Sequence, residues 1–282
     1  MKLDLIAVLA ILVLPFLLRD GFILSVASVA TIYSILSLSW FFMERKAGWV
    51  SLFHSIPFGL AAYALAINPI LIVPTFIISL LIFIVLSLTG REKFIFASFI
   101  TAVVFWYLSH YIVLTVNGEL IGGEEGFSFP PIGATQAYLI SSLILIASLA
   151  SFVAISKSAL GLKIEAVRDD EVAARCIGID AMRIRIISFA ISTFLAFLAG
   201  ICYILYFGHA SPEIFSIEVA LLPFVASLIA GKRLLSPVAG SYAIIIISRA
   251  FAGILPGAHL VLYAAVLILS PKLSRWWNAE GG

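Results

Sequence analysis

The sequence predicts an all-α, polytopic membrane protein, and its composition and its pattern of apolar runs both lead to this fold class. Hydrophobic residues make up 63% of the 282 residues and charged residues only 11%, whereas soluble domains are about 45–50% apolar and about 25% charged. The mean hydropathy is +1.18, and apolar runs close to the ~20 residues that span a bilayer recur along the chain. This composition argues against a soluble enzyme, a disordered protein and a nucleic-acid-binding protein.

The apolar runs predict about ten membrane segments, some of them short or broken. We expect the first run to be a retained helix and not a signal peptide, because Arg19 and Asp20 follow it in place of a small-residue cleavage site. As a helix, Val219–Ala230 is only about 18 Å long, so we expect it to be broken or re-entrant in a hydrocarbon core of about 30 Å. The runs are Leu5–Leu18, Phe22–Phe42, Val50–Ile67, Ile70–Leu88, Phe94–Val116, Ala137–Ile155, Ile186–Phe207, Val219–Ala230, Leu234–Leu255 and Ala258–Leu269.

The distribution of Lys and Arg predicts that both termini are cytoplasmic (N-in and C-in). Basic residues fall in alternate loops, at Arg45/Lys46, at Arg91/Lys93 and within Lys163–Arg185. Cytoplasmic loops carry an excess of such residues, so these three loops are expected on the cytoplasmic side. The loops Asn117–Gly133 and Gly208–Glu218 contain Glu but no Lys or Arg, and we expect them on the opposite side.

Groups that carry chemistry are scarce in the predicted spans. Arg249 is the main charged residue in them, and intramembrane charges usually mark proton relays and ion sites, which argues against an ion-coupled carrier. No G-x-x-x-x-G-K-[ST] phosphate loop occurs, so any energy from ATP must come from a partner. The histidines and the two cysteines have no metal-binding or catalytic spacing. We therefore expect no catalytic residue, no metal and no cofactor in this chain.

The segment from Ala47 to Tyr63, here called the polar segment, is unusually polar for a membrane span. It holds glycines, a proline and polar side chains within one span, among them Gly48, Ser51, His54, Ser55, Pro57 and Gly59. A break at Gly or Pro frees backbone groups that must find other partners. Such a cluster beside an apolar wall would suit a small zwitterionic or amide substrate in transit. The alternative is helix packing, in which small residues allow close approach and Ser and His bond across helices.

The segment Ser156–Arg185, here called the charged segment, predicts a short helix from about Asp170 to Ile177. Acidic residues at 169–171 suit a helix N-terminus, Glu171 and Arg175 form an i,i+4 pair, and Gly178 fits the position after the helix. Apolar side chains beside these charges are typical of a helix that lies against a cytoplasmic partner. The alternative is a helix on lipid headgroups, but acidic residues disfavour an anionic leaflet.

Together the two segments resemble the permease subunits of branched-chain amino acid ABC importers, specifically the M-type permease. The family pattern A-G-x-x-S-L-x-H-x-x-x-F-G-x-x-A-Y is met by Ala47, Gly48, Ser51, Leu52, His54, Phe58, Gly59, Ala62 and Tyr63. Residues 168–179 closely match the stretch R-E-D-E-x-A-A-x-x-x-G-I. Asn117–Phe129 is similar to the external T-G-G-s-x-G-l loop, and Ser211-Pro212 with Phe215-Ser216 to the S-P-x-x-F-s segment. The similarity runs from about residue 25 to residue 272.

The resemblance implies one transmembrane permease domain over residues 1–282, with a cytoplasmic coupling loop at 156–185, in the cell (inner or plasma) membrane. It implies a second related permease subunit, two cytoplasmic ATPase subunits that hydrolyse the ATP, an extracytoplasmic solute-binding protein, contact with lipid, and no nucleic acid. The implied ATPase-coupling residues are Arg168, Asp169, Asp170, Glu171, Ala173, Ala174 and Gly178. The implied translocation pathway contains Gly48, Ser51, His54, Phe58, Gly59 and Tyr63.

Two other functions stay open: a stand-alone carrier or channel for a small neutral solute, and a membrane enzyme or scaffold. Three departures from the family pattern bear on the substrate. Residues 230–234 read Ala-Gly-Lys-Arg-Leu where the family has a glycine pair, Phe53 precedes His54 in place of glycine, and Trp49 replaces a small or amide residue. The bulky side chains are expected to reshape the pathway, and the sequence leaves the amino acid or amide unidentified.

Overall fold

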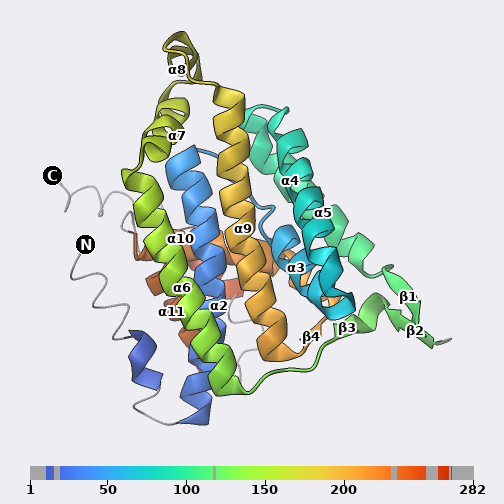
Figure 1. Cartoon of the computed structure of the whole chain (residues 1–282). Coiled ribbons are helices and arrows are strands. Elements are labelled where there is room, and N and C mark those ends of the chain that lie inside the picture. The colour runs from blue at the N-terminus through green and yellow to red at the C-terminus, as the bar shows by residue number, and fades with distance from the viewer. Residues whose placement is uncertain are drawn as a thin grey trace.

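The computed structural model describes residues 11–15, 20–116, 119–229, 234–251, 260–266 and 268, which form a bundle of helices with two short strand pairs at one end (Figure 1). The helices are α2 (Gly21–Phe42), α3 (Ser55–Ile67), α4 (Ile72–Ser87), α5 (Arg91–Ser109), α6 (Ala134–Lys157), α7 (Ala159–Asp169), α8 (Glu171–Cys176), α9 (Ala181–Phe207), α10 (Ile217–Ile229) and α11 (Ser236–Phe251). The strands are β1 (Val113–Val116), β2 (Glu119–Gly122), β3 (Phe127–Ser128) and β4 (His209–Ala210). The π-helix η1 (Met43–Ala47) continues α2, and the short 3-10 helices are η2 (Pro69–Leu71), η3 (Gly123–Glu125) and η4 (Pro212–Phe215).

Among the residues that the structure describes, five helical segments are long and apolar enough to cross a membrane, which confirms the all-α, polytopic class. They are Gly21–Ala47, Pro69–Ser87, Arg91–Ser109, Ala134–Lys157 and Ala181–Phe207, and Ser55–Ile67, Ile217–Leu228 and Ser236–Phe251 are shorter apolar helices. The predicted runs Leu5–Leu18 and Ala258–Leu269 lie partly outside the described residues. The total of about ten segments therefore stays a prediction.

Two predicted runs are shorter as helices than expected. Within Phe94–Val116, α5 ends at Ser109 and residues 113–116 form β1, which pairs antiparallel with β2. Three of the four residues in β1 are β-branched, which favours a strand over a helix. Within Val50–Ile67, α3 begins only at Ser55. As expected, α10 is short, with 13 residues and Pro223 inside it, but whether it crosses the membrane stays a prediction.

Helix α2 forms the centre of the bundle, between α6 and α9 in Figure 1, and it also packs against α10 and α11. About 61% of the residues in the apolar part of its span are buried, against 17% for the α4 span and 22% for the α5 span. Its polar side chains reach across to α11, because Thr31 Oγ1 lies 2.7 Å from Tyr242 Oη and Ser37 Oγ lies 2.8 Å from Ser241 Oγ. Such hydrogen bonds between helices are typical of packing in lipid.

The three basic loops meet at one end of the bundle, as the alternate spacing predicts. Lys46 pairs with Glu165, and Arg91 Nη1 donates a hydrogen bond to the Arg168 carbonyl oxygen at 2.7 Å. Helices α7 and α8 lie at this end, and the strands lie toward the other end (Figure 1). There β3 pairs with β4, which joins the two loops that contain Glu but no Lys or Arg. The side of the membrane on which each end lies stays a prediction.

Candidate functional site

The polar segment contains a break in the helix, residues 48–54, between η1 and α3. Gly48 has a φ of +72°, which residues with a side chain rarely adopt. Neighbouring groups satisfy the freed backbone atoms: Trp40 Nε1 donates to the Ser51 carbonyl oxygen at 2.6 Å, and the Leu52 amide donates to Ser98 Oγ at 3.0 Å. The predicted break is therefore present, and protein surrounds it as an irregular backbone in a membrane requires.

His54 lies at the end of the break and bonds to the central helices. Its Nε2 is 2.9 Å from Ser192 Oγ on α9, and that hydroxyl lies 3.0 Å from the Ser39 carbonyl oxygen on α2. A hydroxyl has one proton, so Ser192 donates to Ser39 and accepts from His54, which fixes the imidazole proton on Nε2. Among the described residues, the buried Nδ1 of His54 finds no hydrogen-bond partner. The imidazole therefore presents one free acceptor inside the bundle.

Further along α3, Gly59 and Tyr63 contact two loops that the family resemblance also singled out. A Cβ on Gly59 would lie 2.4 Å from Phe215 Cε1, so only glycine lets this ring approach the helix. The Tyr63 ring meets Phe215 at 5.0 Å and Phe127 at 5.1 Å, both edge to face. Phe58 packs edge to face on Tyr203, at 5.3 Å between ring centroids. Rings from two distant stretches, one at residue 127 and one at residues 203–215, thus converge on α3.

The structure separates the predicted pathway residues into two places. All except Gly48 are buried in the interior around α3; they are Ser51, His54, Phe58, Gly59 and Tyr63. Gly48 lies at the end with the basic loops, where a Cβ would come within 2.5 Å of Arg168 Cγ. The glycine therefore connects the polar segment to the charged segment. The Tyr63 hydroxyl is, like His54 Nδ1, a buried polar group for which the described residues provide no partner.

The charged segment contains the predicted short helix, α8, which covers Glu171–Cys176. Asp170 caps it, accepting hydrogen bonds from the Val172 and Ala173 amides at 2.8 and 3.0 Å. Gly178 ends it with a φ of +83°, the left-handed conformation that glycine favours after a helix. Asp169 differs from the expectation: it is the last residue of α7, not part of the α8 N-terminus. There it pairs with Arg168 at 2.8 Å.

Arginine contacts that the sequence interpretation did not predict fix the charged segment to the bundle. Arg185 Nη2 lies 2.8 Å from both carboxylate oxygens of Glu171, which also pairs with Arg175 as predicted. Arg168 Nη1 donates to the Arg45 carbonyl oxygen at 2.6 Å. The sequence signal for these arginines was the alternation of basic loops. That signal predicts the side of the membrane but not these contacts. At the tip, Val172 and Ile177 remain 71% and 75% exposed.

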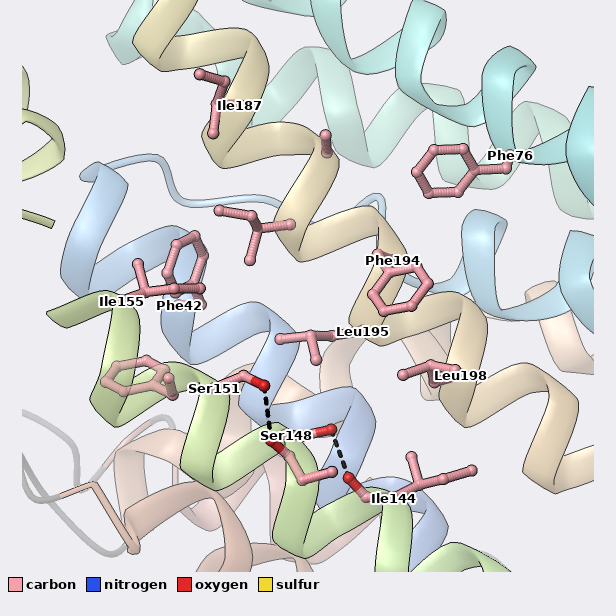
Figure 2. Close-up of a pocket in the computed structure, with 14 residues that line it drawn as sticks. Phe42, Phe76, Ile144, Ser148, Ser151, Ile155, Ile187, Phe194, Leu195 and Leu198 are labelled. Carbon is pink, nitrogen blue, oxygen red and sulfur yellow. Dashed lines mark hydrogen bonds between the residues drawn. The ribbon is translucent and has the colours of Figure 1, made fainter. Parts of the chain in front are cut away.

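A large apolar cavity lies apart from the polar segment. It has a volume of about 540 Å³ and lies between α6 and α9, with Phe42 of α2 and Phe76 of α4 at its sides (Figure 2). The hydroxyls of Ser148 and Ser151 in its wall donate to carbonyl oxygens of their own helix, at 2.7 and 2.8 Å. With its hydroxyl protons thus engaged, this wall suits lipid tails better than a zwitterion.

Within the described residues there is no group of three or more His, Cys, Asp or Glu that could hold a metal ion. The absence of a metal and of a cofactor stays a prediction.

Comparisons with known proteins place the chain in a transport family. Residues 22–271 match the family described as branched-chain amino acid transport system / permease component. The high-affinity branched-chain amino acid transport system permease protein LivM of Escherichia coli is 35% identical over 79 residues, which is 28% of this chain and 19% of that protein. A probable LivM of Methanocaldococcus jannaschii is 25% identical over 130 residues, 43% of this chain and 38% of the relative. No solved structure matches. Since the family match covers most of its length, the chain belongs to the permease components of branched-chain amino acid transport systems.

Proposed function

We propose that this chain is the transmembrane permease subunit of an ATP-driven ABC importer for branched-chain or related amino acids. It forms the translocation pathway with a second, related permease subunit. Two cytoplasmic ATPase subunits drive the pathway, and an extracytoplasmic solute-binding protein delivers the substrate. The relatives are matched over only 19% and 38% of their own lengths, so the transport function in their names supports this proposal for the present chain without establishing it.

The geometry of α8 is the observation that carries the proposal. This short helix lies at the tip of the charged segment, beyond the end of α9 (Figure 1). Asp170 and Gly178 fix its two ends, and Glu171 ties it to Arg185. Its outer surface carries the exposed apolar side chains Val172 and Ile177. A rigid helix with apolar side chains at its tip suits a groove on a cytoplasmic protein. Such a helix can transmit a displacement of that protein to the bundle.

We assign the ATPase-coupling role to the charged segment and the pathway role to the polar segment. The coupling residues are Arg168, Asp169, Asp170, Glu171, Ala173, Ala174 and Gly178. The pathway residues are Ser51, His54, Phe58, Gly59 and Tyr63, with Gly48 as the hinge between the two segments. His54 Nδ1 and the Tyr63 hydroxyl are neutral, buried and unpartnered within the described residues, so they can bond a zwitterion once α3 and α9 separate. The described residues show α3 closed against α9, because the Phe58 carbonyl oxygen approaches Gly200 closely.

Co-purification followed by transport tests this proposal. A tag on the full chain should bring down a P-loop ATPase and a second permease from native membranes. With the solute-binding protein present outside, proteoliposomes whose ATPase subunits face the interior should accumulate radiolabelled leucine only when ATP is enclosed. Leucine flux through the chain alone without ATP would instead support a stand-alone carrier, and the absence of any co-purifying ATPase would overturn the importer.

The exposed Cys176 provides a direct test of orientation. It is the last residue of α8, whereas the second cysteine, Cys202, is buried. In intact cells that express the full chain alone, a membrane-impermeant maleimide should label Cys176 only after permeabilisation, since the positive-inside rule places the charged segment in the cytoplasm. Cys176→Ser is the matched control for labelling at this site. Equal labelling of intact cells would reverse the predicted N-in, C-in topology.

A further inference from the structure

Trp49 occupies a junction between the charged segment and the helices of the bundle. It follows Gly48 in the break and is 96% buried, with only 4% of its surface exposed. Two guanidinium groups lie over its ring system: Arg185 Cζ is 5.0 Å and Arg91 Cζ is 5.7 Å from the ring centroid. Both distances are within the range of a cation–π interaction, which is strongest with tryptophan.

Both arginines also hold the charged segment. Arg185 donates to the two carboxylate oxygens of Glu171, the first residue of α8, at 2.8 Å each. Arg91 donates to the carbonyl oxygens of Val167 and Arg168 in the last turn of α7, at 3.3 and 2.7 Å. A displacement of α7 and α8 must therefore move the two groups that lie over the Trp49 ring.

On its other sides, Trp49 begins a chain of buried aromatic rings that ends at His54. Trp49 meets Phe189 of α9 edge to face at 5.6 Å, and Phe189 meets Phe83 of α4 at 5.3 Å. Phe83 in turn meets the His54 imidazole edge to face at 5.7 Å. Phe94 of α5 closes the cluster, 4.9 Å from Trp49. The contacts thus run without interruption from α8 to the imidazole in the break.

We propose that Trp49 is a positioning residue that transmits the movement of α8 to His54, an inference that rests on the proposed importer function. Close-packed side chains cannot deform continuously and switch between a few arrangements. Trp49 lies in the break and is in contact with groups from α5 and α9. A shift of Arg185 therefore has to move the Trp49 ring, and with it the Phe189 ring.

Trp49→Leu tests the link in the complex that co-purifies with the full chain. We expect the complex to assemble and hydrolyse ATP, while the ATP used per leucine imported rises about fivefold, the lower end of coupling between sites. Arg185→Gln should act similarly, and the double variant should be no worse than either single one, because both interrupt one connection. Phe41→Leu is the matched control. It also removes a buried ring, with Arg45 Cζ at 5.9 Å, that is not in the chain from α8 to His54.

The outcomes separate the link from the importer function itself. If the wild-type complex shows no ATP-dependent leucine uptake, the proposed function fails. Suppose instead that the wild-type complex couples ATP use to uptake. The link is wrong if the assembled Trp49→Leu complex uses as much ATP per leucine as wild type, or if Phe41→Leu raises this ratio equally.

Spin-label mobility tests the same link in the full chain alone. A nitroxide on the exposed Cys176 of α8 should become more mobile in Trp49→Leu and in the distant Phe83→Leu, with Trp49→Phe in between. If the label spectrum is the same in Phe83→Leu and wild type, no transmission reaches α8 from the interior. This measurement needs no ATPase, so it tests the link even if Trp49→Leu fails to assemble with the ATPase.

Discussion

The charged segment and the polar segment are both rich in hydrogen-bonding groups, and they satisfy these groups in opposite ways. Around α8, ion pairs and caps between neighbours in the sequence, such as Asp170 with the Val172 amide, provide the partners. Around His54, the partners come from helices more than a hundred residues away, such as Ser192, and one ring nitrogen finds none among the described residues. The short helix α8 is therefore formed by local rules, whereas the polar segment depends on the packing of the bundle.

This difference predicts where mutations will unfold the chain and where they will only uncouple it. Changes in the contact between α3 and α9 should destabilise the fold, because the partners of the polar segment are positioned by that contact. Changes in α8 should leave the bundle intact and affect only what α8 contacts.

The largest effect is expected from Gly200→Val, which places a side chain between α9 and α3. A Cβ at Gly200 would lie 2.0 Å from the Phe58 carbonyl oxygen, and a backbone atom cannot move aside as a flexible side chain can. Overpacking costs about 1–3 kcal/mol, occasionally more, so we expect a large loss of folded yield and a lower melting temperature in detergent. Gly21→Val is the control, since nothing lies within 4 Å of its Cβ position. Equal stability of the two variants would contradict a tight contact.

The next largest effect is on transport and not on stability, in Asp170→Lys and Gly178→Glu. Asp170 caps α8, and the loss of a cap costs about 1 kcal/mol, which frays a helix that the bundle does not need for folding. Gly178 has open space around it but a φ of +83°, so a side chain strains the turn. Leucine uptake should be abolished while complex yield and melting temperature stay close to wild type.

Asp20→Ala provides the matched comparison for a cap without a coupling role. Asp20 caps α2 and accepts hydrogen bonds from the Phe22 and Ile23 amides at 2.7 and 3.2 Å, much as Asp170 does for α8. Its loss should cost similar stability and leave uptake per complex unchanged. If Asp170→Ala and Asp20→Ala reduce uptake equally, the charged segment has no special role.

A smaller effect is expected at His54, where substitution separates a pathway role from packing. His54→Leu removes the donor to Ser192 and the free Nδ1 acceptor, whereas Ser192 keeps its bond to the Ser39 carbonyl oxygen. The lost hydrogen bond costs about 1 kcal/mol, so the complex should assemble with uptake reduced about tenfold, equivalent to 1.4 kcal/mol of transition-state stabilisation. His54→Gln, which still offers a donor and an acceptor, should keep more activity. Unchanged uptake per complex in His54→Leu would make His54 a packing residue.

The sequence predicted most of the helices and the form of α8, because both follow from local patterns. Apolar runs gave α2, α4, α6 and α9 close to their observed bounds, and acidic residues followed by Gly178 indicated a short, capped helix. It did not predict β1, whose β-branched residues extend an apolar run without a polar boundary.

The site was predictable only as a set of residues and not as an arrangement. The Ser192 partner of His54, the Phe215 ring on Gly59 and the two arginines over Trp49 all come from distant segments. Their positions depend on how the helices pack, for which a single sequence has no local signal. Gly48 shows the same limit, since its place beside Arg168 depends on the fold of the charged segment.

The smallest effect is expected at Arg175, the more exposed of the two arginines that pair with Glu171. Its side chain is 61% exposed, whereas that of Arg185 is 13% exposed and keeps both bonds to the carboxylate. Exposed i,i+4 pairs contribute only about 0.3–0.5 kcal/mol and weaken with salt. Arg175→Gln should therefore change the melting temperature little and leave the ATP used per leucine near the wild-type value, while Arg185→Gln raises it. If Arg175→Gln uncouples transport as strongly as Arg185→Gln, Glu171 acts through the exposed surface of α8, and the connection through Trp49 is not the one that transmits.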